Sequence, residues 1–333
     1  TTKKQISIND TSYVLMLSAD NVSYENNIDI QNINFESRAF NDNFEIGVNW
    51  MNSDSSLWGF VNLNGMLLGN GGFDFFIHPA RFSSAKTGDW IIKDTTLINV
   101  GKDDIQINKF AINNTIQKIN IDGYLSKDPE KELNVDIKDI SINNINSLFG
   151  INAFELNGSF NLSSTIKNIY NEMVFSSKAL IYEIKLDDYA IGDMSLMTSW
   201  DSDSSRINLS GGLMNEIHHN EIEIKESFYI PDFTIDDQLD LNLSFNNLDI
   251  DFVNTFLPED FLSNMEGKLK GYLKVDGNWS KPELNGKINL NNGEITLNEF
   301  NTDYSFAGDL LFHPDEIVIN QIPIYDNQDI AGE

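Results

Sequence analysis

Apolar and polar residues alternate along most of the chain, most clearly in the segment MEGKLKGYLKVDGNWSKPELNGKINLNNGEITL (265–297). Leu269, Leu273 and Val275 share one phase of this alternation with Gly267 and Gly271, and lysines occupy much of the opposite phase. Side chains of a β-strand point alternately to its two faces. The pattern therefore predicts strands with one apolar and one polar face.

The same pattern recurs from one end of the chain to the other, in roughly two dozen short segments. Stretches rich in glycine, proline and Asp or Asn separate them, and we expect turns at 69–72, 128–129, 201–205 and 291–293. Helix signals are scarce. Pro258 predicts one short helix that carries Phe261 and Leu262, and INNINSLFG (142–150) is a weaker candidate. The predicted fold class is all-β with one or two short helices.

An internal repeat is visible in the pattern. ISINNINSLFG (140–150) aligns with LDIDFVNTFLP (248–258), apolar residue on apolar residue, and an alternating segment precedes each. This predicts pseudo-repeats over 133–237 and 239–333. With 7 prolines in the chain and no linker-like stretch, we expect one continuous structure over 1–333.

The apolar face of so many strands needs a covering layer, and the sequence has too few helices to supply it. Two architectures remain, either tandem β-sandwiches or one long sheet curled around its own apolar face into a U-shaped trough, an elongated half-barrel. Open twisted sheets rarely exceed ~10 strands without curling or splitting. Gly267 and Gly271 in the inward phase either relieve crowding on a concave face or mark a bulge or close packing point.

Charge and composition exclude several function classes. The 51 acidic and 22 basic residues give a net charge of −29, which repels phosphate backbones and argues against nucleic-acid binding. A solvated polar surface is the simplest interpretation of this charge. The absence of cysteine excludes a thiol nucleophile, a disulfide framework and a thiolate metal site. No run approaches the ~20 apolar residues of a membrane span.

The first residues, TTKKQISI, already read as the approach to a strand, with no initiator Met and no signal peptide. We expect a fragment or a processed chain, with further strands on both sides.

Catalytic and metal-binding patterns are weak throughout. The histidines, His78, His218, His219 and His313, lack metal spacing and favour surface or turn roles. The Asp residues of 187–188 and 201–203 lack the spacing of an EF-hand. No carboxylate pair, nucleophile elbow, P-loop or dinucleotide fingerprint stands out. We therefore expect no enzyme, no metal and no cofactor.

Five tryptophans could stack on sugars in a lectin, although buried or rim packing is the commoner role of scattered Trp residues.

Two segments carry a family resemblance. GYLKVDGNWSKPELNGKINLNNGEITL (271–297) and FNTDYSFAGDLLFHPDEIVI (300–319) resemble the C-terminal modules of the TamB family, in which a glycine-rich strand pair precedes a turn with Pro and Gly and a strand with Tyr and Gly. The upstream segments FEIGVNWMN, DWIIKDTTLI and INNTIQKINIDGYLSKDPEKELNVDI resemble a Bacteroidota-type member. The resemblance covers essentially the whole chain and rests on the order of these motifs.

This resemblance implies a long curled β-sheet with an apolar interior, related to the AsmA-like bridge proteins. It also implies a periplasmic body, an N-terminal inner-membrane anchor and a C-terminal contact with an outer-membrane barrel of the TamA/BamA type. The implied activity is phospholipid passage between the two membranes, together with outer-membrane protein assembly. This sequence lacks the anchor, and it stops at IYDNQDIAGE, before the final strands expected to meet the barrel.

We therefore expect an apolar groove that shelters acyl chains. An acyl chain of about fifteen methylenes costs roughly 12 kcal/mol to leave in water. The residues that the alternation assigns to the groove lining are Leu133, Val135, Ile137, Leu239, Leu241, Leu243, Phe245, Leu269, Leu273, Val275, Ile288, Leu290, Ile295 and Leu297. Asn242, Lys270, Lys274 and Asn289 are expected on the opposite, wet face. The alternative is a tandem β-sandwich envelope or adhesion protein without a transport role.

Overall fold

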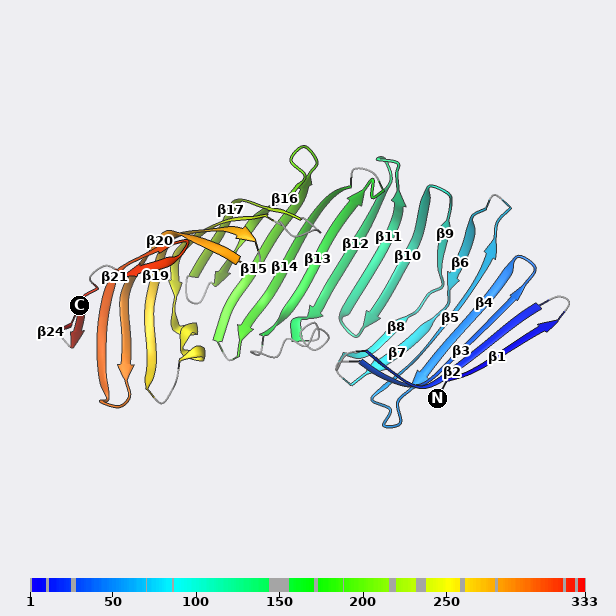
Figure 1. The fold of residues 1–333 in the computed structure, drawn as a ribbon, viewed down its shortest axis with the longest axis horizontal. Coiled ribbons are helices and arrows are strands. Elements are labelled where there is room, and N and C mark those ends of the chain that lie inside the picture. Colours follow the sequence, from blue (N-terminus) through cyan, green and yellow to red (C-terminus); the bar gives the residue numbers. More distant parts are fainter. Residues whose placement is uncertain are drawn as a thin grey trace. The chain divides into compact units, whose positions relative to one another are not determined.

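Strands dominate the computed structural model of the protein (Figure 1). The structure describes residues 2–9, 12–24, 28–69, 71–85, 87–143, 156–170, 173–187, 189–215, 220–231, 238–257, 261–278, 281–319, 322–326 and 329–332. Within these ranges there are 24 strands, β1–β24, and one 3₁₀ helix, η1. The predicted all-β class is confirmed.

The chain divides into two units. Unit 1 comprises Thr1–Ala153 and Ser159–Phe175, and unit 2 comprises Phe154–Gly158 and Ser176–Glu333. The predicted continuity over 1–333 and the pseudo-repeats 133–237 and 239–333 stay predictions.

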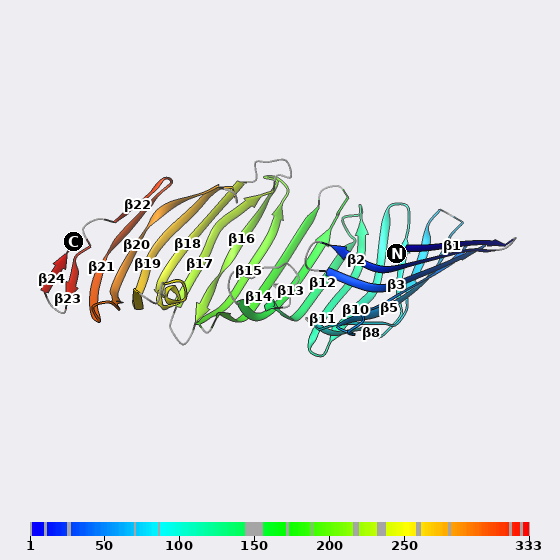
Figure 2. The ribbon, with the colours of Figure 1, turned by 60° about the horizontal axis from the view of Figure 1, so that its bottom comes forward.

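Unit 1 is built from an antiparallel meander, in which most strands pair with the next along the chain. Its strands are β1 Thr2–Asn9, β2 Ser12–Tyr24, β3 Ile28–Phe40, β4 Asn43–Met51, β5 Leu57–Leu67, β6 Phe73–Ile77, β7 Ala80–Ser84, β8 Gly88–Ile92, β9 Thr96–Val100, β10 Asp104–Asn114, β11 Gln117–Ser126, β12 Glu132–Ser141 and, for most of its length, β13 Leu156–Lys167. In Figure 2, β1–β3 run in a clearly different direction from β10–β12, as expected for a strongly twisted sheet.

Two positions of the meander hold broken strands. β6 and β7 pair with the two halves of β5, and β9 and β8 pair with β6 and β7 in turn. The break between β6 and β7 falls at His78–Pro79. Proline has no backbone N–H to donate to a neighbouring strand, so the ladder is interrupted there.

Unit 2 repeats the same organisation. β14 to β21 pair in chain order, β21 then pairs with both β22 and β23, and β24 pairs with β23. The elements are β14 Val174–Leu186, β15 Tyr189–Asp201, β16 Arg206–Asn215, β17 Asn220–Ile230, β18 Gln238–Asp249, η1 Asp251–Phe256, β19 Leu262–Asn278, β20 Lys281–Leu297, β21 Thr302–His313, β22 Glu316–Ile319, β23 Ile324–Asp326 and β24 Asp329–Gly332. A β-sandwich needs two separate sheets. Here the ladders join the strands of each unit into one sheet, which favours the curled single-sheet architecture.

Bulges explain why the apolar alternation changes phase within single strands. In β12 the register shifts between Ile137 and Ile140, where Asp139 adopts a φ of 55°. The Asp139 N–H donates to Asn161 Oδ1 on β13 at 2.6 Å, so the unpaired amide of the extra residue is satisfied. Ile137 and Ile140 consequently lie on the same face.

The turn predicted at 291–293 is wrong. β20 continues through this segment, and its register with β21 shifts between Leu290 and Gly293 around Asn292, whose φ is 51°. Asn and Gly tolerate a left-handed backbone in turns and in bulges alike. The bulge keeps Ile295 and Leu297 on the face of Leu290.

The short helix predicted to start at Pro258 is also wrong in its position. The helical turn is η1, Asp251–Phe256, which ends before Pro258, and Leu262 already belongs to β19. Pro258 itself and residues 144–150 of the second candidate helix lie outside the described residues. Asn254 explains the position of η1, because its side chain donates to Met265 O and accepts from Met265 N–H, each at 2.7 Å. This pair of bonds holds the turn against β19.

Gly271 marks a close approach of backbones beside a bulge. It lies opposite Phe245 and Ile288, its φ is 156°, and the neighbouring strand β18 bulges between Phe245 and Leu248. A Cβ at this position would overlap the backbone oxygen of Lys287. Of the two roles left open for this glycine, the structure supports the bulge and close packing.

Replacing Gly271 with Ala should therefore strain the sheet. We expect Gly271→Ala to lower the free energy of unfolding by about 2–3 kcal/mol, because the backbone must move to admit the Cβ. Urea unfolding followed by circular dichroism measures this. Gly47→Ala in β4 is the matched control and should change stability by less than about 0.5 kcal/mol. Equal unfolding midpoints for the two variants would contradict this account of Gly271.

Candidate functional site

The apolar residues of β18, β19 and β20 form rows across unit 2. Leu243 lies opposite Leu273, and Leu269 lies opposite Leu290. Directly opposed residues of an antiparallel pair share a face of the sheet. The rows therefore produce one apolar face from strands that the sequence connects through short turns.

The structure divides the predicted groove residues between the two units. Those on β18, β19 and β20 come together on this face of unit 2. Leu133, Val135 and Ile137 lie on β12 of unit 1, opposite Gly123, Ile121 and Ile119. The residues expected on the wet face also pair with each other, Asn242 with Lys274 and Lys270 with Asn289.

Burial varies along this apolar face. Leu239, Ile288 and Leu290 are only 4–6% exposed, whereas Leu241, Leu243 and Leu273 are half-buried. On β22, Ile317 and Ile319 are 57% and 61% exposed.

The two exposed isoleucines lie opposite Phe312 and Leu310, on the apolar face of the sheet. Large aliphatic side chains that stay open to solvent on such a face leave apolar area available for an apolar ligand.

An apolar cavity of about 850 Å³ occupies one end of this face. Its lining residues are Leu290, Ile295, Leu297, Tyr304, Phe306, Leu310, Ile319, Ile322, Ile324, Ala331 and Gly332. None of them is charged. The volume falls within the range of small-molecule sites, and among the described lining residues the Tyr304 hydroxyl is the only polar side-chain atom.

The sequence predicted three of the lining residues, Leu290, Ile295 and Leu297, and missed the others. Tyr304, Phe306 and Leu310 belong to the alternating segment YSFAGDLLF (304–312), so extending the period-two pattern would have found them. Ile322 has no such signal, because it lies between β22 and β23. Its side chain packs where a Cβ of Gly308 would lie.

Unit 1 carries a comparable apolar face. Ala80, Trp90, Ile92 and Ile112 form a buried cluster on β7, β8 and β10, with further apolar residues of unit 1 packed against it. Phe75 packs edge-to-face against Phe44 and Phe73, with ring centroids 5.3 and 4.8 Å apart.

The tryptophans with described contacts follow the packing interpretation. Trp90 is 8% exposed, Trp50 packs over Gly59, and Trp58 lies under the Arg81 guanidinium, 5.2 Å from its ring centroid.

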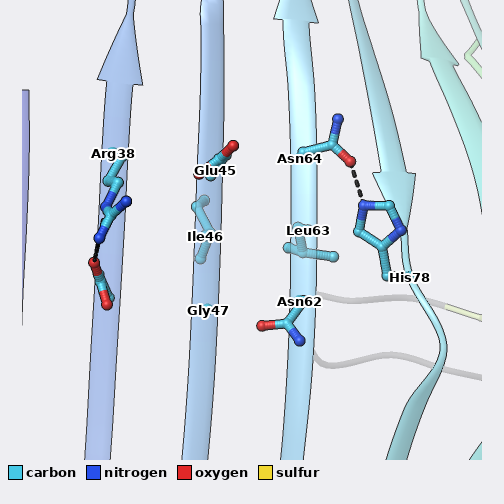
Figure 3. Close-up of a pocket in the computed structure, with 9 residues that line it drawn as sticks. Arg38, Glu45, Ile46, Gly47, Asn62, Leu63, Asn64 and His78 are labelled. Atoms are coloured by element: carbon cyan, nitrogen blue, oxygen red, sulfur yellow. Dashed lines mark hydrogen bonds and ion pairs between the residues drawn. The ribbon is translucent and has the colours of Figure 1, made fainter. Parts of the chain in front are cut away.

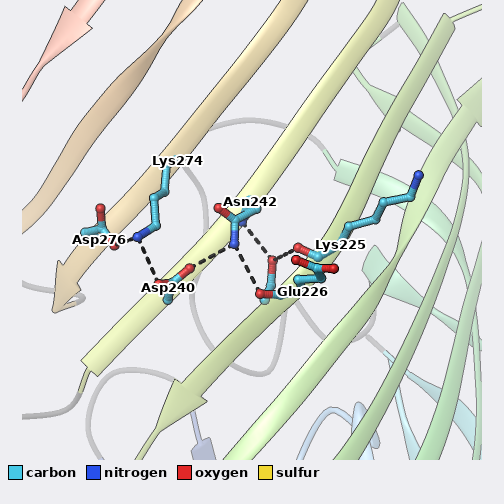
Figure 4. A network of polar contacts seen from close by, with 7 residues as sticks. Lys225, Glu226, Asp240, Asn242, Lys274 and Asp276 are labelled. Carbon is cyan, nitrogen blue, oxygen red and sulfur yellow. Dashed lines mark hydrogen bonds and ion pairs between the residues drawn. The ribbon is translucent and has the colours of Figure 1, made fainter.

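The opposite face of the unit 2 sheet is polar and internally paired (Figure 4). Lys274 Nζ lies 3.0 Å from Asp240 Oδ2 and 2.8 Å from Asp276 Oδ1, so one amine connects β18 and β19. The Asn242 amide donates to Asp240 Oδ1 at 2.9 Å and to Glu226 O at 3.2 Å. These contacts keep the polar side chains on the outer surface and separate them from the apolar rows.

Hydrogen bonds from Lys274 to Asp276 and to Asp240, in that order, raise the pKa of the lysine above its ordinary value. They outweigh the partial desolvation of the amine, which acts in the opposite direction.

Metal chemistry finds little support among the described residues, where no three or more His, Asp and Glu side chains gather as a cation site. His78 pairs with the Asn64 side chain. His218 and His219 lie outside the described residues. No helix in the described ranges combines the length and apolar character that a membrane crossing requires.

Comparison with known families decides the affiliation of the chain. The model of the TamB N-terminal domain matches residues 8–290. The chain belongs to the TamB family. No curated protein and no solved structure matches it. TamB-family proteins are periplasm-spanning envelope proteins of the bridge-like lipid-transport class.

The matching TamB model describes the N-terminal domain of the family, whereas the motifs at 271–319 resemble its C-terminal modules. The Bacteroidota type and the position of this chain within a longer TamB protein stay predictions.

An aspartate introduced on the apolar face distinguishes an open face from a closed core. We expect Leu239→Asp to cost about 3–5 kcal/mol of stability, because the carboxylate would be buried without a partner. Leu243→Asp should cost clearly less, about 1–2 kcal/mol, because its half-buried carboxylate can recruit water. Urea unfolding of both variants measures the difference. If Leu243→Asp unfolds as readily as Leu239→Asp, the face is closed and the groove interpretation loses its physical basis.

The Lys274 ion pairs should respond to pH only in the alkaline range. Folding raises the pKa of Lys274. The stability that its ion pairs contribute is therefore fully present below the ordinary lysine pKa near 10.4, and it is lost as pH rises through the higher pKa of the folded state. The side chain is 40% exposed, so the contribution should stay below about 1 kcal/mol.

Stability profiles of Lys274→Gln and Lys270→Gln test this pH dependence. Lys270 has no ion pair among the described residues and serves as the control on the same face. The free energy of unfolding that Lys274→Gln loses relative to the unmodified chain should be constant from about pH 6 to 9 and should shrink above about pH 10.4. A loss that already changes near neutral pH would contradict the assignment.

Proposed function

We propose that this TamB-family chain is a segment of a periplasmic bridge that shelters acyl chains and conducts phospholipid between the inner and outer membranes. The observation that carries the proposal is the incompletely buried apolar face of unit 2, with a cavity of about 850 Å³ whose described lining residues carry no charge. An acyl chain lying on this face leaves water and covers the open aliphatic side chains in the same event. In this way the chain would support outer-membrane biogenesis.

Energetics supports a lipid rather than a small polar ligand. An acyl chain of about fifteen methylenes gains roughly 12 kcal/mol when it leaves water completely. On a half-open face the acyl chain gains only part of this free energy. A partial gain suits a surface that conducts lipid, because a lipid that is bound too tightly does not move along it. The net charge of −29 adds a second effect, since it repels anionic head groups from the polar surface.

The partners in this proposal follow from family membership. They are phospholipid, an outer-membrane barrel protein of the TamA/BamA type and the inner membrane, reached through an N-terminal anchor. The proposed location is the periplasm, and the proposed role involves no catalysis, metal or cofactor. The TamB match over 8–290 supports these assignments at the level of the family.

Site-specific photo-crosslinking tests where lipid lies. Photoreactive residues at Leu243 and Leu273 should capture phospholipid in cells, because both side chains lie on the apolar face and oppose each other. Asn242 and Lys274 are the matched control pair, since they occupy the neighbouring positions of the same strands and face the other way. Mass spectrometry of the crosslinked chain identifies the lipid.

We expect at least a tenfold excess of lipid adducts at the apolar pair over the polar pair, about the ratio that a 1.4 kcal/mol preference gives. Equal labelling of both pairs would reject the assignment of lipid to the apolar face. A complementary measurement uses Leu243→Asp, which should fold yet fail to support the outer membrane, because each passing acyl chain would have to desolvate a carboxylate.

A further inference from the structure

A second pocket lies in unit 1, on the polar face of the sheet (Figure 3). Its volume is about 510 Å³, and β3, β4, β5 and the residue after β6 contribute its lining. The lining residues are Glu36, Arg38, Glu45, Ile46, Gly47, Asn62, Leu63, Asn64 and His78. Ile46 and Leu63 pair with each other and belong to the apolar phase of their strands, and the lining side chains of the opposite phase are polar.

Gly47 lines this pocket from β4 without a structural reason for being glycine. A glycine inside a strand weakens it and usually marks a bulge, a strained backbone, a close packing point or a site where a ligand approaches. The register of β4 with β3 and β5 is regular at Gly47, and its φ is outside the left-handed region. A Cβ there would meet only the tip of one side chain, Asn62 Oδ1, at 3.2 Å.

The two glycines of the neighbouring strand β5 have clear packing roles. A Cβ on Gly59 would overlap the Trp50 ring, and a Cβ on Gly65 would overlap the Phe44 ring. Both face the apolar side, where an aromatic ring fills the space. Gly47 faces the polar side between Glu36 and Asn62, the residues directly opposite it on β3 and β5, and the space that its missing side chain leaves is a hollow with Asn62 Oδ1 as one wall.

The polar groups around the hollow offer both donors and acceptors. Glu36 Oε1 accepts from Arg38 Nε at 2.9 Å, which orients the guanidinium along β3. His78 pairs with the Asn64 side chain, and the backbone N–H of His78 donates to Asn62 O at 3.0 Å. In the part of the chain that the structure describes, the Asn62 amide and the Glu45 carboxylate have no hydrogen-bond partner. These two groups can bond to a ligand without breaking an existing contact.

This mixture of groups selects a ligand class. Two carboxylates beside a guanidinium do not supply the six to eight oxygen ligands of Ca²⁺. The same carboxylates repel a free anion. Hydroxyl groups donate and accept at once, so a neutral ligand with several of them can bond to amide, carboxylate and guanidinium together.

An aromatic ring stands beside the pocket. Phe60 precedes Asn62 by two residues on the same face of β5 and is 40% exposed. A sugar ring combines several hydroxyls with an apolar face that can lie on such an aromatic ring. We propose that this hollow binds a sugar unit of a glycan. The site lies on the polar face of the sheet, so the inference goes beyond the proposed lipid function and does not rest on it.

Gly47→Thr tests the proposal by filling the hollow. Threonine favours strands, and the regular backbone of β4 accepts it, so the melting temperature should not fall. The probes are chitotriose and maltotriose, titrated into the purified chain and followed by calorimetry and by NMR of the labelled protein. At least one of them should bind the unmodified chain, and Gly47→Thr should weaken this binding at least tenfold.

Two further variants make the result specific. Asn62→Ala removes an amide from the wall without adding volume, and it should weaken binding even if Gly47→Thr perturbs β4. Asn285→Thr introduces the same threonine on the polar face of β20, outside the pocket, and should leave binding unchanged.

The proposal is overturned if neither trisaccharide binds, or if Gly47→Thr and Asn62→Ala bind as well as the unmodified chain. It is equally overturned if the two variants alter the binding of inorganic phosphate or Ca²⁺ instead, because the hollow would then be an ion site. Lipid crosslinking at Leu243 should be the same in Gly47→Thr and in the unmodified chain. The two functions therefore fail independently.

Discussion

Antiparallel pairing between sequence neighbours is the constraint on which the rest of this structure depends. Within each unit most strands bond to the strand that follows them, so their backbone N–H and C=O groups are satisfied without a crossover connection. The same pairing fixes the register, and register decides which side chains share a face. Leu243 and Leu273 lie together because their amides are in register, and Asn242 and Lys274 are consequently sent to the other face.

A sheet that grows in this way produces an apolar face without producing the layer that would bury it. In unit 2 some residues on that face are almost fully buried, such as Leu239 and Leu290, while Ile317 and Ile319 remain largely exposed. A soluble enzyme would close such a face with helices or a second sheet, because exposed aliphatic area is unfavourable in water. A protein that handles acyl chains benefits from leaving it open, since the ligand supplies the missing layer. The cavity lined by β20–β24 is where this incomplete burial becomes a defined space.

Glycine serves different purposes on the two faces. Gly271 is required by backbone geometry, because its φ of 156° and the approach of Lys287 leave no room for a side chain. Gly47 has neither constraint, and its position in the lining of a polar pocket gives it a different meaning. The distinction cannot be made from composition, since both glycines occur within alternating strand patterns. It depends on which neighbouring atom a Cβ would meet.

Period-two alternation alone was sufficient to predict the fold class and the membership of the apolar rows, because side-chain direction in a strand follows from local backbone geometry. It was also sufficient for Leu290, Ile295 and Leu297 in the cavity lining. Turn chemistry predicted the turn of 201–205. It failed at 291–293, where the same Asn and Gly residues permit either a turn or a bulge, and only the register with β21 distinguishes them. The helix predicted from Pro258 was misplaced for a similar reason, since the helical turn η1 is held by the contact of Asn254 with Met265 on another element. The place of Ile322 in the cavity and the hollow at Gly47 were decided by tertiary structure alone, because each depends on atoms brought close by strand pairing rather than by the local sequence.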